Sequence, residues 1–342
     1  MRRGLFGVLA TLLLIAALTI GAVPVAAKSH LTVLLDGLSS PKALSAGPGR
    51  TLVIGAGAFG PPGPLQLYHI GGRARGTTDV ILDEIAVADV AVLPDGTGWA
   101  IGTDLVLYHG DLDGNVTPVL DIPAYQATDP DPFNADGVDP TESNPFGVAV
   151  LPNGDALVAD AAANDVLRVT ESGDVTTVAR WASEEIAPGV VTEAVLTSIA
   201  IGRDGWIYVG QLTGFPGIPG TSHIWRVNPE ADGAVCDVTG DDPDCSVWKS
   251  GFTSIVDLAI DTASGKTYVY EIAEGGFLAF EEGFATGDFP PAVLLLVHGN
   301  NRTELVPGQL SEPGGVVVMP DGVYVTDGTF TGGRLVRIRA NN

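Results

Sequence analysis

Two stretches of the chain read Gly147-Val-Ala-Val-Leu-Pro-Asn-Gly154 and Gly315-Val-Val-Val-Met-Pro-Asp-Gly322, and they are copies of one phrase. Alternating apolar residues lead into a tight turn, and a second apolar run follows. Alternation places one face of a strand in a core, and Asn-Gly or Asp-Gly supplies the positive φ angles of a hairpin. Further copies begin at Ala43, Asp89, Ser198 and Asp257. About six copies, roughly 45–60 residues apart, predict a repeat architecture.

Each copy continues with further short apolar segments that are typical of strands. The third strands are expected at Leu65–Ile70, Leu105–His109, Val166–Thr170, Ile224–Val227, Val293–His298 and Leu335–Arg339. Four short antiparallel strands per unit, repeated radially, make a β-propeller blade. Periodic helix signals are almost absent. We therefore predict an all-β, six-bladed β-propeller, because the competing β-sandwich does not explain one turn phrase that returns in register.

The two ends of the chain are expected to close the ring together. The copy that starts at Gly315 shows only three strands before the chain ends, whereas His30–Leu38 is an apolar strand without a blade of its own. We expect His30–Leu38 to form the outer strand of the last blade, beside Leu335–Arg339. The result is a single propeller domain over residues 28–342, a size that is normal for this architecture although it exceeds the usual single-core limit.

The first 27 residues resemble a secretory signal peptide. Arg2 and Arg3 precede an apolar run from Leu5 to Val23, and Val25-Ala-Ala27 offers small residues for cleavage. The alternative is an uncleaved anchor, because the apolar run approaches the length that spans a bilayer. Either interpretation predicts an exported protein, in the periplasm, at the cell surface or outside the cell.

Charge and cysteine content agree with export. The formal net charge of −24 leaves no basic surface for nucleic acid, so nucleic-acid binding is excluded. The acidity serves solubility, or it attracts cations or a basic partner. Cys236 and Cys245 are the only cysteines, and they flank a short polar segment. In an oxidising compartment they are expected to form a disulfide on a surface loop.

Several stretches in order along the chain resemble the ScyD/ScyE family. They are Ser143–Val150, Leu157–Val169, Tyr208–Gly220 and Gly251–Ala259, and the Leu-Thr-Gly-Phe-Pro element from Leu212 is the most distinctive part. The resemblance implies an exported six-bladed propeller without assigned catalytic residues. The chain is also similar to NHL-type repeats and, more remotely, to gluconolactonase and strictosidine-synthase propellers.

Four polar residues are candidate ligands for a divalent cation. Asp89 and Asp257 stand at the start of the strands expected nearest the axis, and Asn144 and Glu271 could converge with them. Ca²⁺ and Mg²⁺ take such oxygen ligands, and the remote similarity to lactonases implies an ion at the axis. The acidic loop Asp129–Glu142 is either solvated or capped by calcium.

The loop from Gln211 to Gly220 interrupts its blade where most copies turn at once. Its residues Gln211 and Phe215 are candidate ligand contacts at the mouth of the central channel, together with Glu271 and Asn144. Loops on a rigid scaffold commonly carry binding residues, and a Phe at a concave mouth suits an aromatic or apolar ligand. The alternative is that this loop is a structural plug over the blade core.

Two classes of function follow from these observations. The first is a binding or scaffolding module for an unknown small molecule or an extracytoplasmic protein, and we expect a monomer. The second is a hydrolase of the lactonase kind that depends on a divalent metal at the axis. No complete catalytic motif occurs in the chain, which favours the binding module.

Overall fold

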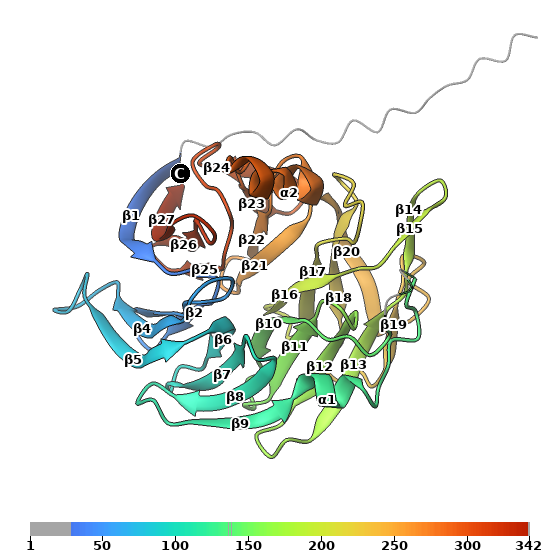
Figure 1. Ribbon diagram of the computed structural model, residues 1–342, viewed down its shortest axis with the longest axis horizontal. Coiled ribbons are helices and arrows are strands. Elements are labelled where there is room, and N and C mark those ends of the chain that lie inside the picture. The colour runs from blue at the N-terminus through green and yellow to red at the C-terminus, as the bar shows by residue number, and fades with distance from the viewer. Residues whose placement is uncertain (1–28, 136, 138, 341–342) are drawn as a thin grey trace, which may run out of the picture.

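The computed structural model describes residues 29–135, 137 and 139–340, so the predicted signal segment 1–27 lies outside the described residues. In the described part of the chain, six sheets of four or more strands stand around a central axis as blades (Figure 1). The prediction of an all-β, six-bladed propeller is confirmed. Within these same residues, no helix is both long and apolar enough to cross a membrane.

The blades follow one another in chain order. Blade 1 consists of β2 (Leu44–Gly47), β3 (Thr51–Ile54), β4 (Gly63–His69) and β5 (Thr78–Ile85), and blade 2 of β6 (Val87–Val92), β7 (Thr97–Gly102), β8 (Val106–Asp111) and β9 (Val116–Asp121). Blade 3 consists of β10 (Pro145–Val150), β11 (Ala156–Asp160), β12 (Asp165–Val169) and β13 (Val175–Trp181), with β19 (Ala234–Cys236) added in parallel to β13. Blade 4 consists of β16 (Leu196–Ile201), β17 (Ile207–Gln211), β18 (Ser222–Val227) and β20 (Cys245–Phe252). Blade 5 consists of β21 (Ile255–Asp261), β22 (Lys266–Glu271), β23 (Val293–His298) and β24 (Asn301–Leu305), and blade 6 of β25 (Val316–Met319), β26 (Gly322–Asp327), β27 (Gly333–Ala340) and β1 (Ser29–Leu38).

The turn phrase forms the hairpin between the first and second strands of a blade. Gly154 has a φ of +97° and its N–H donates to the Leu151 carbonyl at 2.9 Å. Gly96 does the same in blade 2, with a φ of +95° and a bond to Leu93 of 3.0 Å. The first strands of successive blades contact one another around the ring, so these strands line the axis.

The ring is closed by one strand from each end of the chain. β1 pairs with β27 in antiparallel register, with Ser29 opposite Ala340 and Leu38 opposite Gly333. This confirms the expected position of His30–Leu38. Leu335 and Val336 of β27 are completely buried, so the seam is part of the core.

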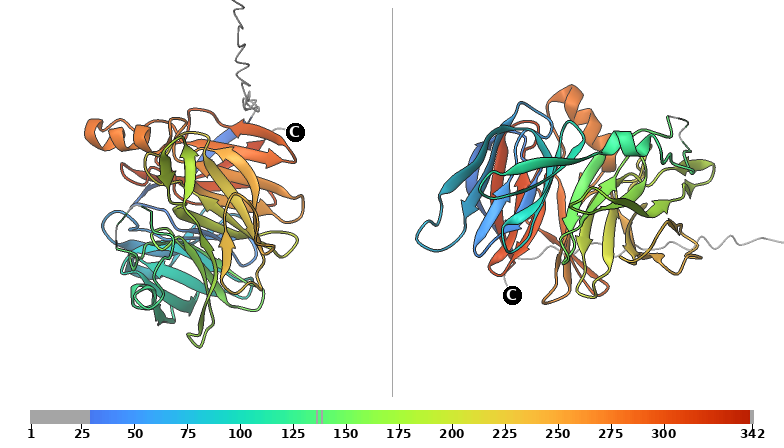
Figure 2. Two further views of the ribbon diagram at one scale, coloured as in Figure 1. Left: turned by 90° about the vertical axis from the view of Figure 1, so that its right-hand side faces the viewer. Right: turned by 90° about the horizontal axis from the view of Figure 1, so that it is seen from below.

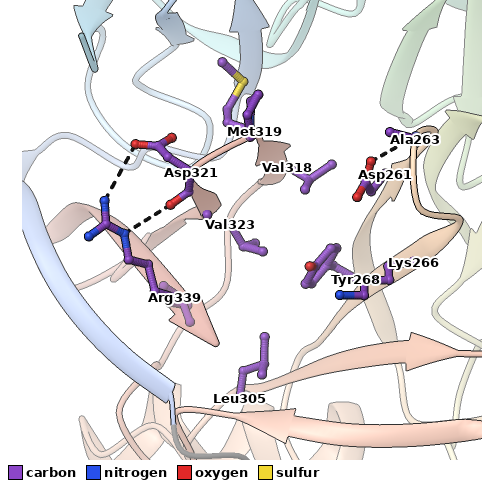
Figure 3. Close-up of a pocket in the computed structure, with 13 residues that line it drawn as sticks. Asp261, Ala263, Lys266, Tyr268, Leu305, Val318, Met319, Asp321, Val323 and Arg339 are labelled. Carbon is purple, nitrogen blue, oxygen red and sulfur yellow. Dashed lines mark hydrogen bonds and ion pairs between the residues drawn. The ribbon is translucent and has the colours of Figure 1, made fainter. Parts of the chain in front are cut away.

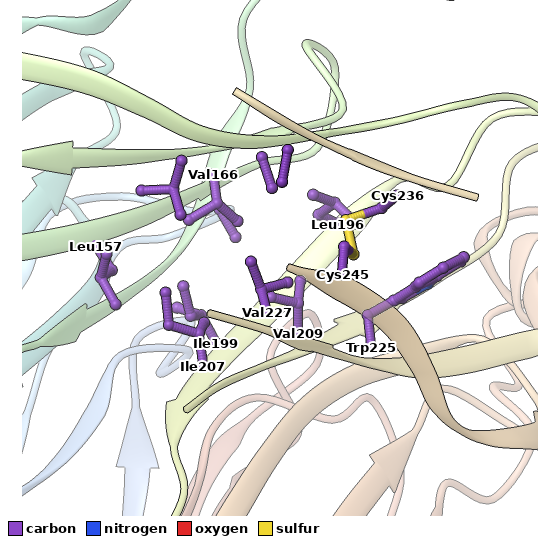
Figure 4. Packing of buried hydrophobic residues seen from close by; sticks show 14 of the residues in the cluster. Leu157, Val166, Leu196, Ile199, Ile207, Val209, Trp225, Val227, Cys236 and Cys245 are labelled. Carbon is purple, nitrogen blue, oxygen red and sulfur yellow. A yellow bond between two sulfur atoms is a disulfide. The ribbon is translucent and has the colours of Figure 1, made fainter. Parts of the chain in front are cut away.

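Apolar side chains fill the spaces between neighbouring blades. Between blades 3 and 4, Leu157 and Val166 face Ile199, Val209 and other residues of the next blade (Figure 4). Trp181 and Trp225 of the same cluster meet edge to face, with ring centroids 6.1 Å apart. Burial of these side chains is the main source of stability, because apolar area removed from water contributes about 25 cal/mol per Å².

The disulfide between Cys236 and Cys245 is confirmed, with the two Cα atoms 5.2 Å apart. Its predicted place on a surface loop is wrong, because the two cysteines are 0% and 1% exposed and pack in the core between blades 3 and 4. β19 carries Cys236 and pairs with β13 of blade 3, whereas Cys245 begins β20 of blade 4. The bridge therefore fastens two blades to each other.

Three elements fall outside the repeat. They are helix α1 (Ile122–Gln126), helix α2 (Gly276–Thr286) and the hairpin of β14 (Glu184–Ala187) with β15 (Val190–Thr192). Helix α2 connects the second and third strands of blade 5 and stands out from one face of the disc (Figure 2). The connections between second and third strands in the other blades lie on this same face, since all first strands run in one direction. We call it the α2 face.

Candidate functional site

A buried lysine lies at the start of blade 1, beside the axis. Lys42 precedes β2 and is 5% exposed. Its Nζ donates to the Phe146 carbonyl at 2.6 Å and to the Ala88 carbonyl at 3.1 Å, and it lies 3.9 Å from the centroid of the Phe146 ring. One ammonium group thus connects blades 1, 2 and 3 at the channel.

Two carboxylates occupy equivalent positions on the first strands of blades 2 and 5. Asp89 accepts a hydrogen bond from the Val148 N–H at 2.8 Å, and Asp257 accepts one from the Val316 N–H at 2.6 Å. Each carboxylate therefore ties its own blade to the next. Burial raises the pKa of both, that of Asp257 to about 7, while the charge of Lys42 opposes the rise. Burial lowers the pKa of Lys42, and the two carboxylates oppose that shift.

The four predicted metal ligands do not form one cluster. Asp89 and Asp257 interact electrostatically with each other, but their cationic neighbour is the ammonium of Lys42. That ammonium already places one positive charge beside the two carboxylates, and it would repel a divalent ion. The described residues contain no group of three or more His, Cys, Asp or Glu that could hold a metal. The axis does not fit the divalent cation that the similarity to lactonases implied.

Asn144 lies in a different place, beside the acidic loop. It lines a cavity of about 170 Å³ whose other polar residues are Asp131, Asn134, Asp139, Glu142 and Glu193. Most described residues of this loop are exposed, but Asp131 is 9% exposed and Asp129 forms an ion pair with Arg180. Burial raises the pKa of Asp131.

Gln211 and Phe215 have different environments. Gln211 is 1% exposed, and its amide accepts a bond from Trp225 Nε1 at 2.6 Å and donates one to Thr213 Oγ1 at 3.0 Å. Its side chain forms hydrogen bonds inside blade 4 and is not exposed to a ligand, so its predicted role as a ligand contact is corrected. Phe215 is 77% exposed and makes no part of the core. The plug interpretation therefore does not apply to the Phe215 side chain.

Glu271 is also interior. It ends β22, is 6% exposed, and accepts a hydrogen bond of 2.7 Å from the Thr253 N–H. Burial raises its pKa to about 7, and Arg302 opposes the shift. Its carboxylate orders the connection into blade 5 and does not meet Asp89 or Asp257 in one site.

A cluster of phenylalanines, which was not predicted from the sequence, lies on the α2 face. Phe59 of blade 1 and Phe330 of blade 6 stack with centroids 4.9 Å apart, and Phe330 lies 5.0 Å from Phe284 of α2. Phe280 and Phe289 join the same group at 5.9 Å from Phe330. We call these five rings the phenylalanine cluster. Phe59, Phe284 and Phe330 are 47%, 57% and 39% exposed, so the cluster forms an apolar surface.

The phenylalanine cluster extends toward the axis through Phe146, and hydrogen bonds to Glu312 fix the loop that carries Phe330. Phe59 lies 6.4 Å from Phe146, whose ring carries the Lys42 ammonium. The buried carboxylate of Glu312 accepts the N–H groups of Phe330 and Thr331 at 2.7 and 2.8 Å. Such bonds fix the loop before any ligand arrives, and preorganisation lowers the entropic cost of binding.

Two signals in the sequence could have revealed these residues. In α2, Phe277, Phe280 and Phe284 recur with the spacing of one helix face, so a helix was readable in an otherwise all-β chain. Lys42 stands one residue before the weak copy at Ala43, at the place that Ala88 and Phe146 hold in blades 2 and 3. Because this place in the repeat lies beside the axis, a lysine there indicates that the axis contains charged groups.

The fold defines the class of this protein as a six-bladed β-propeller with four-stranded antiparallel blades. Neither a protein family nor a curated protein sequence matches the chain. Among solved structures, it is similar to a gluconolactonase from Xanthomonas campestris (13% identity, 92% of this chain and 90% of that one, TM-score 0.56). It is also similar to the PQQ-bound aldose sugar dehydrogenase from Streptomyces coelicolor (13%, 93% and 100%, TM-score 0.52). A third is virginiamycin B lyase from Staphylococcus aureus (13%, 91% and 99%, TM-score 0.52). At these identities the similarity shows the fold alone.

Proposed function

We propose that this protein is an exported binding propeller of the ScyD/ScyE type, and that the phenylalanine cluster on the α2 face is its binding surface. The observation that carries the proposal is the exposure of three rings in mutual contact above the buried axis: Phe59 stacks on Phe330, and Phe284 meets Phe330 edge to face. The disulfide indicates an oxidising compartment. Together with the predicted signal segment, this supports a role outside the cytoplasm.

The three exposed rings lie together in a chain with a net charge of −24. Contiguous exposed apolar patches commonly mark interaction sites, and aromatic residues are enriched where protein interfaces are buried. Phe59 is positioned by a 2.9 Å bond from its N–H to Ser40 Oγ, as Phe330 is by Glu312. Rings held in place without a ligand favour a partner with aromatic or apolar groups over a polar sugar.

The alternative function is a lactonase-like hydrolase, as the similarity in fold to two gluconolactonase structures suggests. It would need a divalent ion at the axis, where the charge of Lys42 already interacts with Asp89 and Asp257. Metal analysis of the purified protein separates the two proposals. A stoichiometric divalent ion that is lost in the Asp89→Asn variant would favour the hydrolase.

The binding surface is tested with the fluorescent probe 8-anilinonaphthalene-1-sulfonate on the native protein. We expect saturable fluorescence that falls at least fivefold in the double variant Phe284→Ser, Phe330→Ser. A matched control is Val191→Ser, because Val191 is 56% exposed on the β14–β15 hairpin, away from the cluster. Undiminished probe binding in the double variant, with the fold intact by circular dichroism, would refute the proposal.

A further inference from the structure

A second cavity lies between blades 5 and 6, at the end of the blades opposite to α2. It has a volume of about 510 Å³ and opens between the β21–β22 turn and the β25–β26 turn (Figure 3). This volume is within the range of about 300–1,000 Å³ that is usual for small-molecule sites. The phenylalanine cluster is on the other face, so this cavity is independent of the proposed function.

The inner wall of the cavity is apolar. Leu305 and Val323 are 1% and 3% exposed and belong to the core between blades 5 and 6, and Val318 packs against that core from the side of β25. All three line the cavity. The cavity is therefore a gap that reaches into the interblade core, and an apolar body would fill it.

One polar group inside the cavity has no hydrogen-bond partner among the described residues. Tyr268 of β22 is 8% exposed, and its hydroxyl oxygen faces the open space (Figure 3). Tyr208 and Tyr324 hold the same place in blades 4 and 6, since all three lie opposite equivalent residues of the first strand. Their hydroxyls donate to the turn aspartates of their own blades, Asp204 at 3.1 Å and Asp321 at 2.9 Å.

The longer turn of blade 5 explains why Tyr268 differs. Asp261 begins this turn, and its carboxylate accepts hydrogen bonds from Ala263 and Ser264 within the turn. It therefore does not reach the Tyr268 hydroxyl. With the lengthened turn, the Tyr268 phenol lacks the aspartate contact that its counterparts in blades 4 and 6 make.

Basic side chains stand at the rim of the cavity. Lys266 lines the cavity, and no described residue forms a hydrogen bond or an ion pair with its Nζ, although Asp261 is close enough to interact electrostatically. Across the opening, Arg50, Arg337 and Arg339 all approach Asp321, three cations around one carboxylate. With Asp261 and Asp321 counted, four basic side chains stand against two carboxylates at and around the opening, and this excess favours an anionic ligand.

We propose that the cavity between blades 5 and 6 binds a small amphipathic carboxylate. The apolar chain lies against Leu305, Val318 and Val323, and the carboxylate accepts hydrogen bonds from the Tyr268 hydroxyl and the Lys266 ammonium. The site takes up a ligand that is apolar at one end and anionic at the other.

Decanoate serves as the probe, and 1-decanol is the neutral match for it. Isothermal titration of the native protein should show one saturable decanoate site and at least fivefold weaker binding of decanol. Tyr268→Phe removes only the hydroxyl, and Lys266→Met removes only the charge. Each should weaken decanoate binding about fivefold or more, as expected for the loss of one hydrogen bond to a charged group. Val318→Trp should fill the cavity and abolish binding.

Lys249→Met is the matched control, because Lys249 lies on the outer strand of blade 4 and donates to the Gly299 carbonyl. It should bind decanoate as the native protein does, and so should the Phe284→Ser, Phe330→Ser variant. Melting temperatures check that every variant is folded. Equal binding of decanol and decanoate, unchanged binding by folded Val318→Trp, or the absence of saturable binding would each overturn the proposal.

Discussion

Replacing Lys42 with Met tests the axial cluster most directly. The ammonium donates to two backbone carbonyls, of Ala88 and Phe146. Hydrogen bonds from charged groups contribute roughly 1.5–3 kcal/mol each, and removing one partner of a buried charge group costs about 3–5 kcal/mol. The first figure estimates the loss from the hydrogen bonds and the second from the buried charge, so the two energies are not added. We therefore expect the free energy of unfolding to fall by about 3–5 kcal/mol.

The pH dependence of this loss gives a second check. Lys42 holds down the pKa of Asp89 and of Asp257, so its removal raises both further. A carboxyl group whose pKa is raised in the folded state holds a proton that the unfolded chain has already released. Its contribution to stability is therefore lost as the pH rises from the unfolded pKa through the folded one. The Lys42→Met variant should lose more stability at pH 8 than at pH 5.

Urea denaturation followed by circular dichroism measures both quantities. Lys249→Met is the control, since exposed charges contribute less than about 1 kcal/mol. Adding Asp89→Asn to Lys42→Met should recover part of the loss. A loss below about 1 kcal/mol, or an equal loss at pH 5 and pH 8, would refute the argument that this ammonium compensates the buried carboxylates.

Three further predictions follow from individual residues. Glu271→Gln keeps the acceptor for Thr253 but removes a group whose pKa is raised to about 7, so the fall in stability between pH 4.5 and 7 should shrink; an unchanged pH profile in urea denaturation would contradict this. Cys236→Ala with Cys245→Ala should lower the free energy of unfolding by about 2–4 kcal/mol, and reduction of the native protein should reproduce most of that loss. Phe215→Ala should change the melting temperature little because the ring is 77% exposed, whereas Phe252→Ala, at 0% exposed, should cost about 3–5 kcal/mol, and equal effects would place Phe215 in the core.

The fold could be predicted from the sequence because its determinants are local. The turn of each copy fixes a hairpin by backbone geometry alone, and the repeat gives the number of blades. Val293–His298 was predicted with the bounds that β23 has, and His30–Leu38 differs from β1 by one residue at its start. The strand bounds needed only residues that are close together in the chain, and the number of blades needed only the recurrence of one local phrase.

The site could not be predicted in the same way, since it depends on side chains that meet across the ring. Lys42 reaches carbonyls 46 and 104 residues away. Asp89 and Asp257 were identified correctly as axial residues, but nothing in the sequence indicated that a lysine would be their neighbour. Gln211 was predicted to contact a ligand, but in the structure its side-chain oxygen accepts a hydrogen bond from Trp225. The burial of a polar side chain is decided by packing that a linear motif does not describe.

Because β1 pairs with β27, the ring can close only after the last strand of the domain has been synthesised. Ser29 leaves the ribosome among the first residues of the domain, and its partner Ala340 is among the last. Until then β1 is a free strand edge, and such edges invite pairing with other chains. Contacts between distant parts of a chain also slow folding. A chain cut short before β27 therefore cannot close the ring, and its β1 remains an unpaired strand edge.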